Sequence, residues 1–220
     1  MRHHGVVSVW TIVVAAGSGE RFGAPKQLLP LGDARVVDHA VGVAARVSEG
    51  VVVVVPPDSS WTVDGAVMVT GGTTRSESVR AGLEAVPGEV DIVLVHDAAR
   101  PLATAMLFER VVAAVRDDGA DGAVPGLAMS DTVKRVERDV VVETVPREAL
   151  VSVQTPQGFR TSVLRAAYAR GAEGTDDASV VEAFGGTVVV VAGERDNFKI
   201  TEPGDLERAK AVVATREGVR

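Results

Sequence analysis

Thr11-Ile-Val-Val-Ala-Ala-Gly-Ser-Gly-Glu-Arg-Phe-Gly-Ala-Pro-Lys-Gln27 is the stretch that decides the fold of this chain. It opens as an apolar, largely β-branched run, which is typical of a strand buried on both faces of a sheet. It then becomes a loop with several glycines and two cations, Arg21 and Lys26. Such a loop can lay backbone N–H groups and positive charge against a polyphosphate. The alternative is a plain strand-to-loop turn with incidental charges.

Two well-known phosphate loops do not fit this stretch. A P-loop places Gly-Lys-Ser/Thr directly before a helix, whereas Lys26 lies seven residues after Gly19 and behind Pro25. A dinucleotide-binding fingerprint needs its third glycine three residues after the second, but Gly19 and Gly23 are one residue too far apart. The loop therefore predicts a phosphate site of another type.

Composition bounds the class of protein. The chain has 220 residues, of which 46% are hydrophobic and 24% charged, so we expect one globular domain, residues 1–220. No cysteine is present, which excludes disulfides and thiolate metal sites. A net charge of -7 and only 4% aromatic residues argue against a nucleic-acid binder. No apolar run approaches the ~20 residues of a membrane span, and we expect a soluble, cytoplasmic protein.

Strand-like apolar runs alternate with segments of helical period. This rhythm predicts a mostly parallel sheet covered by helices on both faces, a Rossmann-like three-layer α/β/α fold. The predicted strands after the first cover 51–55, 66–70, 91–95, 151–154 and 187–191, and the predicted helices cover 34–47, 76–86, 104–116 and 161–170, with two more beginning near 175 and 203.

A different pattern occupies residues 131–150. The segments 132–136 and 140–145 alternate in polarity and are joined by a short charged turn, which predicts an antiparallel hairpin inserted as an arm. Valine-rich strands of this kind are a liability when they are left uncovered. We therefore expect a homodimer in which a second subunit packs on the arm.

Candidate site residues follow the predicted strand ends, where ligands bind in open α/β sheets. The glycine loop, Gly71-Gly72, His96-Asp97 and Gln154-Thr155-Pro156 should therefore face one crevice. Asp97 can hold a divalent metal that bridges phosphate oxygens, or it can cap the next helix. Arg100 can clamp a phosphate or pair with Asp97.

Other polar residues also have two interpretations. A lone histidine such as His96 more often makes a local hydrogen bond than an acid–base catalyst. Asp176-Asp177 suggests a metal pair, but acidic residues are expected at the start of a helix. Lys199 is a site cation or a solvated lysine. Arg147 has no role within one chain, but an arm that crosses a dimer axis would supply it to the neighbouring site.

Nine segments, in order along nearly the whole chain, carry a resemblance to a known family. They are Ala15-Ala-Gly-Ser-Gly-Glu-Arg21, Pro25-Lys-Gln27, Gly71-Gly72 with Arg75 and Ser78-Val79, Val95-His-Asp-Ala-Ala-Arg100, Asp131-Thr-Val-Lys134, Thr144-Val-Pro-Arg147, Gln154-Thr-Pro-Gln157, Thr175-Asp-Asp-Ala-Ser179 and Asp196-Asn-Phe-Lys-Ile-Thr201. The chain resembles the nucleotidyltransferases of the sugar-nucleotide type, and most closely the 2-C-methyl-D-erythritol 4-phosphate cytidylyltransferases. Val14 and Thr73 depart from the family, which often has proline and an acidic residue at these positions.

The resemblance implies transfer of a cytidylyl group from CTP to methylerythritol phosphate, with Mg²⁺ as cofactor, in the non-mevalonate isoprenoid pathway. A different acceptor such as ribitol 5-phosphate, or a non-catalytic nucleotide-binding module, are the alternatives.

The resemblance also implies residue roles. Ala15, Ala16, Gly17 and Gly19 would wrap CTP, with Gly72 and Ser78 near the cytosine and ribose. Arg21 and Lys26 would stabilise the α-phosphate transition state and the departing pyrophosphate, and Asp97 would serve both Mg²⁺ and the substrate region. Arg100, Thr132, Thr155 and Thr175 would line the acceptor site, where Lys199 and Arg147 of the partner subunit would position the acceptor phosphate.

Overall fold

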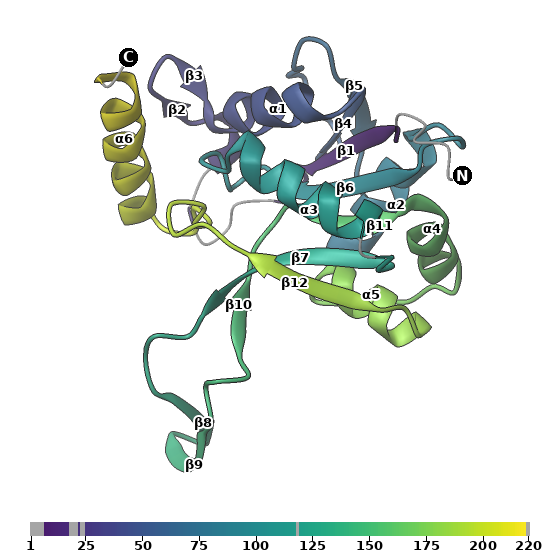
Figure 1. Ribbon diagram of the computed structural model, residues 1–220. Coiled ribbons are helices and arrows are strands. Elements are labelled where there is room, and N and C mark those ends of the chain that lie inside the picture. The colour runs from purple at the N-terminus through teal and green to yellow at the C-terminus, as the bar shows by residue number, and fades with distance from the viewer. Residues whose placement is uncertain (1–6, 18–21, 23–24, 118, 219–220) are drawn as a thin grey trace.

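A central sheet with helices on both faces forms the body of the molecule (Figure 1). The computed structural model describes residues 7–17, 22, 25–117 and 119–218. The eight strands lie in the order β10-β7-β11-β6-β1-β4-β5, and β12 pairs with β7 off this path. Their bounds are β1 Val9–Val14, β4 Gly50–Val55, β5 Val67–Thr70, β6 Ile92–Asp97, β7 Gly122–Ala128, β10 Val151–Val153, β11 Gln157–Arg160 and β12 Val188–Ala192. The predicted three-layer α/β fold is confirmed.

Two hydrophobic clusters cover the two faces of the sheet. Helices α1 (Val36–Val47) and α3 (Ala105–Asp117) pack on one face. Helices α2 (Arg75–Ala85), α4 (Thr161–Ala169) and α5 (Asp177–Phe184) pack on the other. Successive strand residues point to opposite faces, so Ile12 joins one cluster and Val13 the other. This explains why the central strands read as unbroken apolar runs.

Strand direction changes towards one side of the sheet. Strand β1 runs parallel to β4 and β6, and β4 runs parallel to β5. Strand β11, in contrast, lies antiparallel between β6 and β7, and β10 is antiparallel to β7. The sequence pattern did not predict β7 or β11. The first contains Pro125 and two glycines, and the second begins with Gln157 and Gly158, so neither looks like a β-branched run.

One predicted helix begins later than the sequence suggested. Ala34–Arg35 forms a short strand, β3, that pairs with β2 (Pro30–Leu31), and α1 begins only at Val36. A 3₁₀ turn, η2 (Lys26–Leu28), precedes this small hairpin. The expectation of helix from position 34 is thus wrong by two residues.

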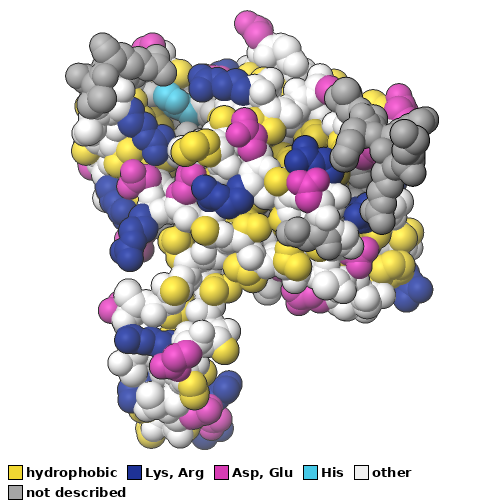
Figure 2. All heavy atoms as spheres, viewed as in Figure 1, with side chains coloured by type: hydrophobic (Ala, Val, Ile, Leu, Met, Phe, Trp, Pro, Cys, Tyr) yellow, Lys and Arg dark blue, Asp and Glu magenta, His cyan; other side chains and the backbone are white. Residues whose placement is uncertain are grey.

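The inserted arm is a separate two-stranded sheet that projects away from the body (Figure 1). Strands β8 (Val133–Glu137) and β9 (Val140–Val145) pair antiparallel, as predicted. Four arm valines are about half exposed or more: Val136, Val140, Val141 and Val142. Figure 2 shows further hydrophobic side chains where the arm leaves the body.

The C-terminal helix α6 (Pro203–Gly218) stands apart from the sheet and packs through a third cluster. Leu206, Ala209 and Val213 of this helix meet Leu31 and Ile200 there. Ile200 also joins the segment between β12 and α6 to the loop after β6, because its N–H donates to the carbonyl oxygen of Ala99 at 2.8 Å. Within the described residues, every helix is too short or too polar to cross a lipid bilayer.

Candidate active site

A cavity of about 550 Å³ opens at the carboxyl ends of β1 and β6. This is the edge of the sheet at which the strand ends predicted a crevice. The cavity brings together eight of the predicted site residues, namely Ala15, Ala16, Gly17, Lys26, Gly72, Ser78, Asp97 and Lys199. Its other lining residues are Val14, Phe22, Gln27, Thr73, Thr74, Arg75, Ala98 and Ala99.

The glycine pair after β5 lets two loops approach each other closely. A Cβ at Gly71 would lie 2.7 Å from Ser78 Oγ and 2.8 Å from Ala16 Cβ. A Cβ at Gly72 would lie 2.3 Å from Glu77 Cβ. Side chains at these two positions would therefore force apart the loop after β1 and the first turn of α2. Packing therefore requires glycine at both positions, because a Cβ would overlap side-chain atoms of the neighbouring segments.

A capping box builds the rim of the cavity at the start of α2. Thr74 Oγ1 accepts a hydrogen bond from the N–H of Glu77, and Glu77 Oε2 accepts from the N–H of Thr74 at 3.0 Å. Glu77 Oε2 also accepts from the N–H and the hydroxyl of Thr73, both at 2.6 Å. The Thr73 hydroxyl bond, followed by those from the Thr74 and Thr73 amides, lowers the pKa of Glu77. Thr73, one of the two departures from the pattern of the family that the sequence resembles, thus binds the carboxylate of Glu77 through both its backbone N–H and its hydroxyl.

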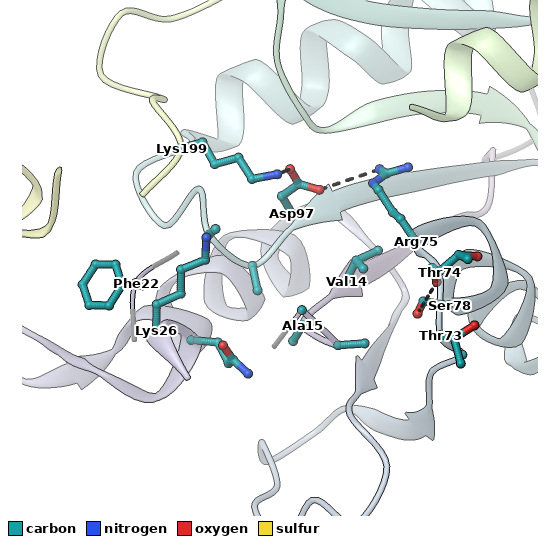
Figure 3. Close-up of a pocket in the computed structure, with 16 residues that line it drawn as sticks. Val14, Ala15, Phe22, Lys26, Thr73, Thr74, Arg75, Ser78, Asp97 and Lys199 are labelled. Carbon is teal, nitrogen blue, oxygen red and sulfur yellow. Dashed lines mark hydrogen bonds and ion pairs between the residues drawn. The ribbon is translucent and has the colours of Figure 1, made fainter. Parts of the chain in front are cut away.

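Asp97 is the charged centre of the cavity, with cations on both sides (Figure 3). Lys199 Nζ lies 2.7 Å from Asp97 Oδ2, and Arg75 Nη2 lies 3.7 Å from Asp97 Oδ1. Burial alone would raise the pKa of the Asp97 carboxyl, but Lys199 and Arg75 outweigh burial and lower this pKa to about 2. Asp97 is therefore a carboxylate at any physiological pH, and it does not cap α3, which begins at Ala105.

Arg75 lines the cavity while its guanidinium is paired with a buried carboxylate, Asp177, and the sequence did not predict this pairing. Its Nη2 lies 2.6 Å from Asp177 Oδ2, and Tyr168 donates a hydrogen bond of 2.7 Å to Asp177 Oδ1. Burial works to lower the pKa of Arg75, but Asp177 and Asp97 raise it above its ordinary value. The Thr74-to-Glu77 capping box was the available sequence signal, since it places Arg75 in the first turn of α2.

The structure supports local structural roles for His96 and Asp176 rather than catalysis or metal binding. His96 is fully buried and bonds Arg100 O and Thr155 Oγ1, so it makes local hydrogen bonds. Asp176 caps α5 by accepting from the N–H of Ser179. The described residues contain no group of three or more histidines and acids that could hold a metal ion.

Five predicted site residues do not line the cavity. Arg100 donates to the carbonyl oxygen of Asn197 at 2.7 Å. Thr155 is buried against Asp97 and His96, and Thr175 is exposed before α5. Thr132 and Arg147 are exposed on the arm, where Arg147 donates to the carbonyl oxygen of Ser130. Two further predicted residues, Gly19 and Arg21, lie outside the described residues.

Comparison with protein families gives one match that covers most of the chain. Residues 9–215 match the family described as IspD: 2-C-methyl-D-erythritol 4-phosphate cytidylyltransferase. A bifunctional enzyme IspD/IspF from Clavibacter michiganensis is 48% identical over 94% of this chain, which spans 55% of that protein's length. A 2-C-methyl-D-erythritol 4-phosphate cytidylyltransferase from Streptomyces avermitilis is 45% identical over 93% of this chain and 91% of its own length.

Solved structures agree with these sequence relatives. The crystal structure of 2-C-methyl-D-erythritol 4-phosphate cytidylyltransferase from Thermus thermophilus matches with a TM-score of 0.80 and 39% identity. The match covers 94% of this chain and 98% of that one.

Proposed function

Because this chain belongs to the 2-C-methyl-D-erythritol 4-phosphate cytidylyltransferase family, it is an enzyme of cytidylyl transfer, and we propose that the cavity around Asp97 is its active site. The proposed substrates are CTP and 2-C-methyl-D-erythritol 4-phosphate. One observation carries this proposal: Lys26, Lys199 and Arg75 line the same cavity as the loop after β1, and Lys199 and Arg75 flank the buried carboxylate of Asp97.

The proposed reaction is an in-line displacement at the α-phosphorus of CTP. An oxygen of the acceptor phosphate forms the new P–O bond, and the bond from the α-phosphorus to the bridging oxygen breaks, which releases pyrophosphate. The acceptor phosphate is already ionised near pH 7, so a strong general base is not needed. What the reaction needs is positive charge where negative charge accumulates. We assign this role to Lys26, and the positioning of the acceptor phosphate to Lys199.

Asp97 fits a magnesium ion that takes most of its ligands from the nucleotide. It is the one carboxylate among the described residues that line the cavity. Mg²⁺ in nucleotide sites usually binds one or two carboxylates together with phosphates and water. When bound, the ion would neutralise phosphate charge, and Asp97 would hold it. Lys199 and Arg75 keep Asp97 ionised and oriented towards the cavity.

We further propose that the enzyme works as a cytoplasmic homodimer, with CTP drawn from the cytoplasmic pool. The arm exposes a row of valines, and a two-stranded hairpin is marginally stable by itself. A second copy of the chain would cover these valines. Arg147, which lies on the arm, would then reach the cavity of the neighbouring subunit.

A pyrophosphate-release assay tests the proposed activity. The purified protein is given CTP and Mg²⁺ with either methylerythritol phosphate or ribitol 5-phosphate as the acceptor. We expect turnover with methylerythritol phosphate, and little turnover when another nucleoside triphosphate replaces CTP. Turnover with ribitol 5-phosphate alone would change the acceptor. Tight binding of CTP without any turnover would indicate a nucleotide-binding module instead.

A further inference from the structure

A fully buried asparagine stands two residues before the proposed phosphate-positioning lysine. Asn197 is 0% exposed, in the segment between β12 and α6. Its side-chain Nδ2 donates to the backbone carbonyl oxygen of Thr155 at 2.9 Å. The backbone carbonyl oxygen of Asn197 accepts from Arg100 Nη1 at 2.7 Å. Asn197 therefore joins the segment of Lys199 to two separate parts of the body, the turn before β11 and the loop after β6.

The turn that Asn197 holds is also bonded to the backbone of Asp97. The Asp97 N–H donates to Thr155 Oγ1 at 3.0 Å, and the same hydroxyl lies 3.1 Å from His96 Nδ1. The carbonyl oxygen of Arg100 can only accept, so Nε2 of the neutral His96 ring carries the proton and donates to it. His96 Nδ1 is then the acceptor of the Thr155 hydroxyl proton. Thr155 is only 5% exposed. Its hydroxyl is thus committed to the backbone of β6 rather than presented to the cavity.

Gln154 fixes the other end of the same segment. Its Oε1 accepts from the N–H of Glu194 at 3.0 Å, and its Nε2 donates to the carbonyl oxygen of Glu194 at 2.8 Å. The Gln154 amide also donates to the carbonyl oxygen of Asn197 at 3.2 Å. The residues from 194 to 197 are therefore bound side by side to the turn at 154–155.

We propose that Asn197 and Thr155 are positioning residues that set the distance between Lys199 and Asp97 before the substrates bind. Asn197 fixes the backbone that carries Lys199, Thr155 fixes the backbone that carries Asp97, and the hydrogen bond between Asn197 Nδ2 and Thr155 O joins the two. Neither residue lines the cavity. The inference rests on the proposed function for the reaction that it serves, but the geometry that it concerns is measurable without turnover.

Kinetics of Asn197→Ala test the inference in the active enzyme. A misplaced Lys199 should lower kcat about 10- to 100-fold and raise the KM for the acceptor. The Kd for CTP, measured by calorimetry without acceptor, should change less than about twofold. Because Asn197 acts through Lys199, the Asn197→Ala, Lys199→Ala double variant should be no slower than Lys199→Ala alone. Rate losses that multiply in the double variant would overturn the proposal.

Two substitutions at Thr155 separate the loss of its hydrogen bond from a general failure to fold. Thr155→Val keeps the shape but removes the hydroxyl, whereas Thr155→Ser keeps the hydroxyl. We expect Thr155→Val to lower kcat about 10-fold or more and Thr155→Ser to retain most of the activity. Equal losses in both variants would show that packing, rather than the hydrogen bond to Asp97, is what matters.

Hydrogen exchange separates this inference from the proposed function. In Asn197→Ala, backbone amides of residues 194–200 should exchange at least about 10-fold faster, while amides of β1 and α2 keep their wild-type rates. Faster exchange throughout the protein, or no change at 194–200, would overturn the proposal. This readout holds even if the wild-type protein shows no turnover with methylerythritol phosphate, a result that would count against the proposed function alone.

Discussion

Arg75 Nη2 lies 2.6 Å from Asp177 Oδ2, although 102 positions separate the two residues in the chain. The carboxylate of Asp177 is fully buried, and its backbone N–H is held by Gln157 Oε1 at 3.1 Å. The pair therefore ties the first turn of α2, at the rim of the cavity, to the first turn of α5. An arginine with a fixed, buried counter-ion presents a rigid positive charge to Asp97.

Asp177→Asn should destabilise the fold, because it removes the nearer counter-ion of the mostly buried Arg75 guanidinium and leaves Asp97, 3.7 Å away, to balance its charge. Loss of one partner of a buried pair typically costs about 3–5 kcal/mol, and we expect roughly 3 kcal/mol here because a quarter of the Arg75 side chain is exposed. Urea denaturation measures this loss. Glu207→Gln removes an exposed pair with Lys210 and serves as the control, which should leave the unfolding free energy almost unchanged.

Lys26→Ala should lower kcat by about two orders of magnitude or more, because the lysine charge is needed most when negative charge develops on the α-phosphate. The Kd for CTP should change far less than kcat. Single-turnover kinetics and calorimetry measure the two quantities, and Lys210→Ala on α6 is the control for loss of a surface lysine. A loss confined to CTP affinity would show that Lys26 binds the ground state and the transition state equally.

Two inactive variants should restore each other if the arm completes the neighbouring site. Arg147→Ala removes the proposed contribution in trans, and Lys26→Ala removes one in cis. In a mixed dimer one of the two sites keeps both residues, so up to about a quarter of the wild-type activity should return after subunit exchange, since half of the dimers are mixed.

Mass spectrometry of differently labelled subunits must confirm that exchange has occurred. Mixing two preparations of Lys26→Ala is the matched control and should restore nothing. Confirmed exchange without recovery of activity would show that Arg147 serves its own subunit or no site at all.

Stability should fall as the pH drops from about 6.5 towards 4. Burial lowers the pKa of His96 to about 4, from an ordinary value of 6.5, so the unfolded chain binds a proton in this interval that the folded chain does not. The full effect is roughly 3 kcal/mol. Urea denaturation between pH 7.5 and 4 at about half-unit steps measures it, and His96→Gln should flatten this slope. The contribution of Asp97 is lost only at lower pH, between its ordinary pKa near 3.8 and about 2.

The central strands could be predicted from the sequence because a strand buried on both faces must be apolar throughout. Strands β1, β4 and β6 are of this kind. Strand β7 could not be predicted, because glycines and a proline make up much of it. At Gly122 a Cβ would lie 2.5 Å from Phe159, so the tight pairing of β7 with β11 selects glycine over the residues that usually mark a strand.

The cavity was predictable as far as it depends on strand ends. Ala15 and Gly72 come just after β1 and β5, Asp97 is the last residue of β6, and the topology of an open sheet brings such positions together. The burial of Thr155 and Asp177 was not predictable. The hydrogen bond between Thr155 and Asp97 spans 58 positions and that between Asp177 and Arg75 spans 102, so the sequence around each residue does not show that its polar atoms are already used.

The two ends of the arm leave the body side by side, because β10 pairs with β7 from Val151–Ala128 to Val153–Gly126. Everything between these paired residues can therefore be exchanged as a cassette without altering the path of the main sheet. Replacing it with a short type I′ turn would give a minimal single-subunit scaffold. In the homodimer proposed above, arms with complementary charges on two copies of the chain would favour an obligate pair of distinguishable subunits over pairs of identical ones.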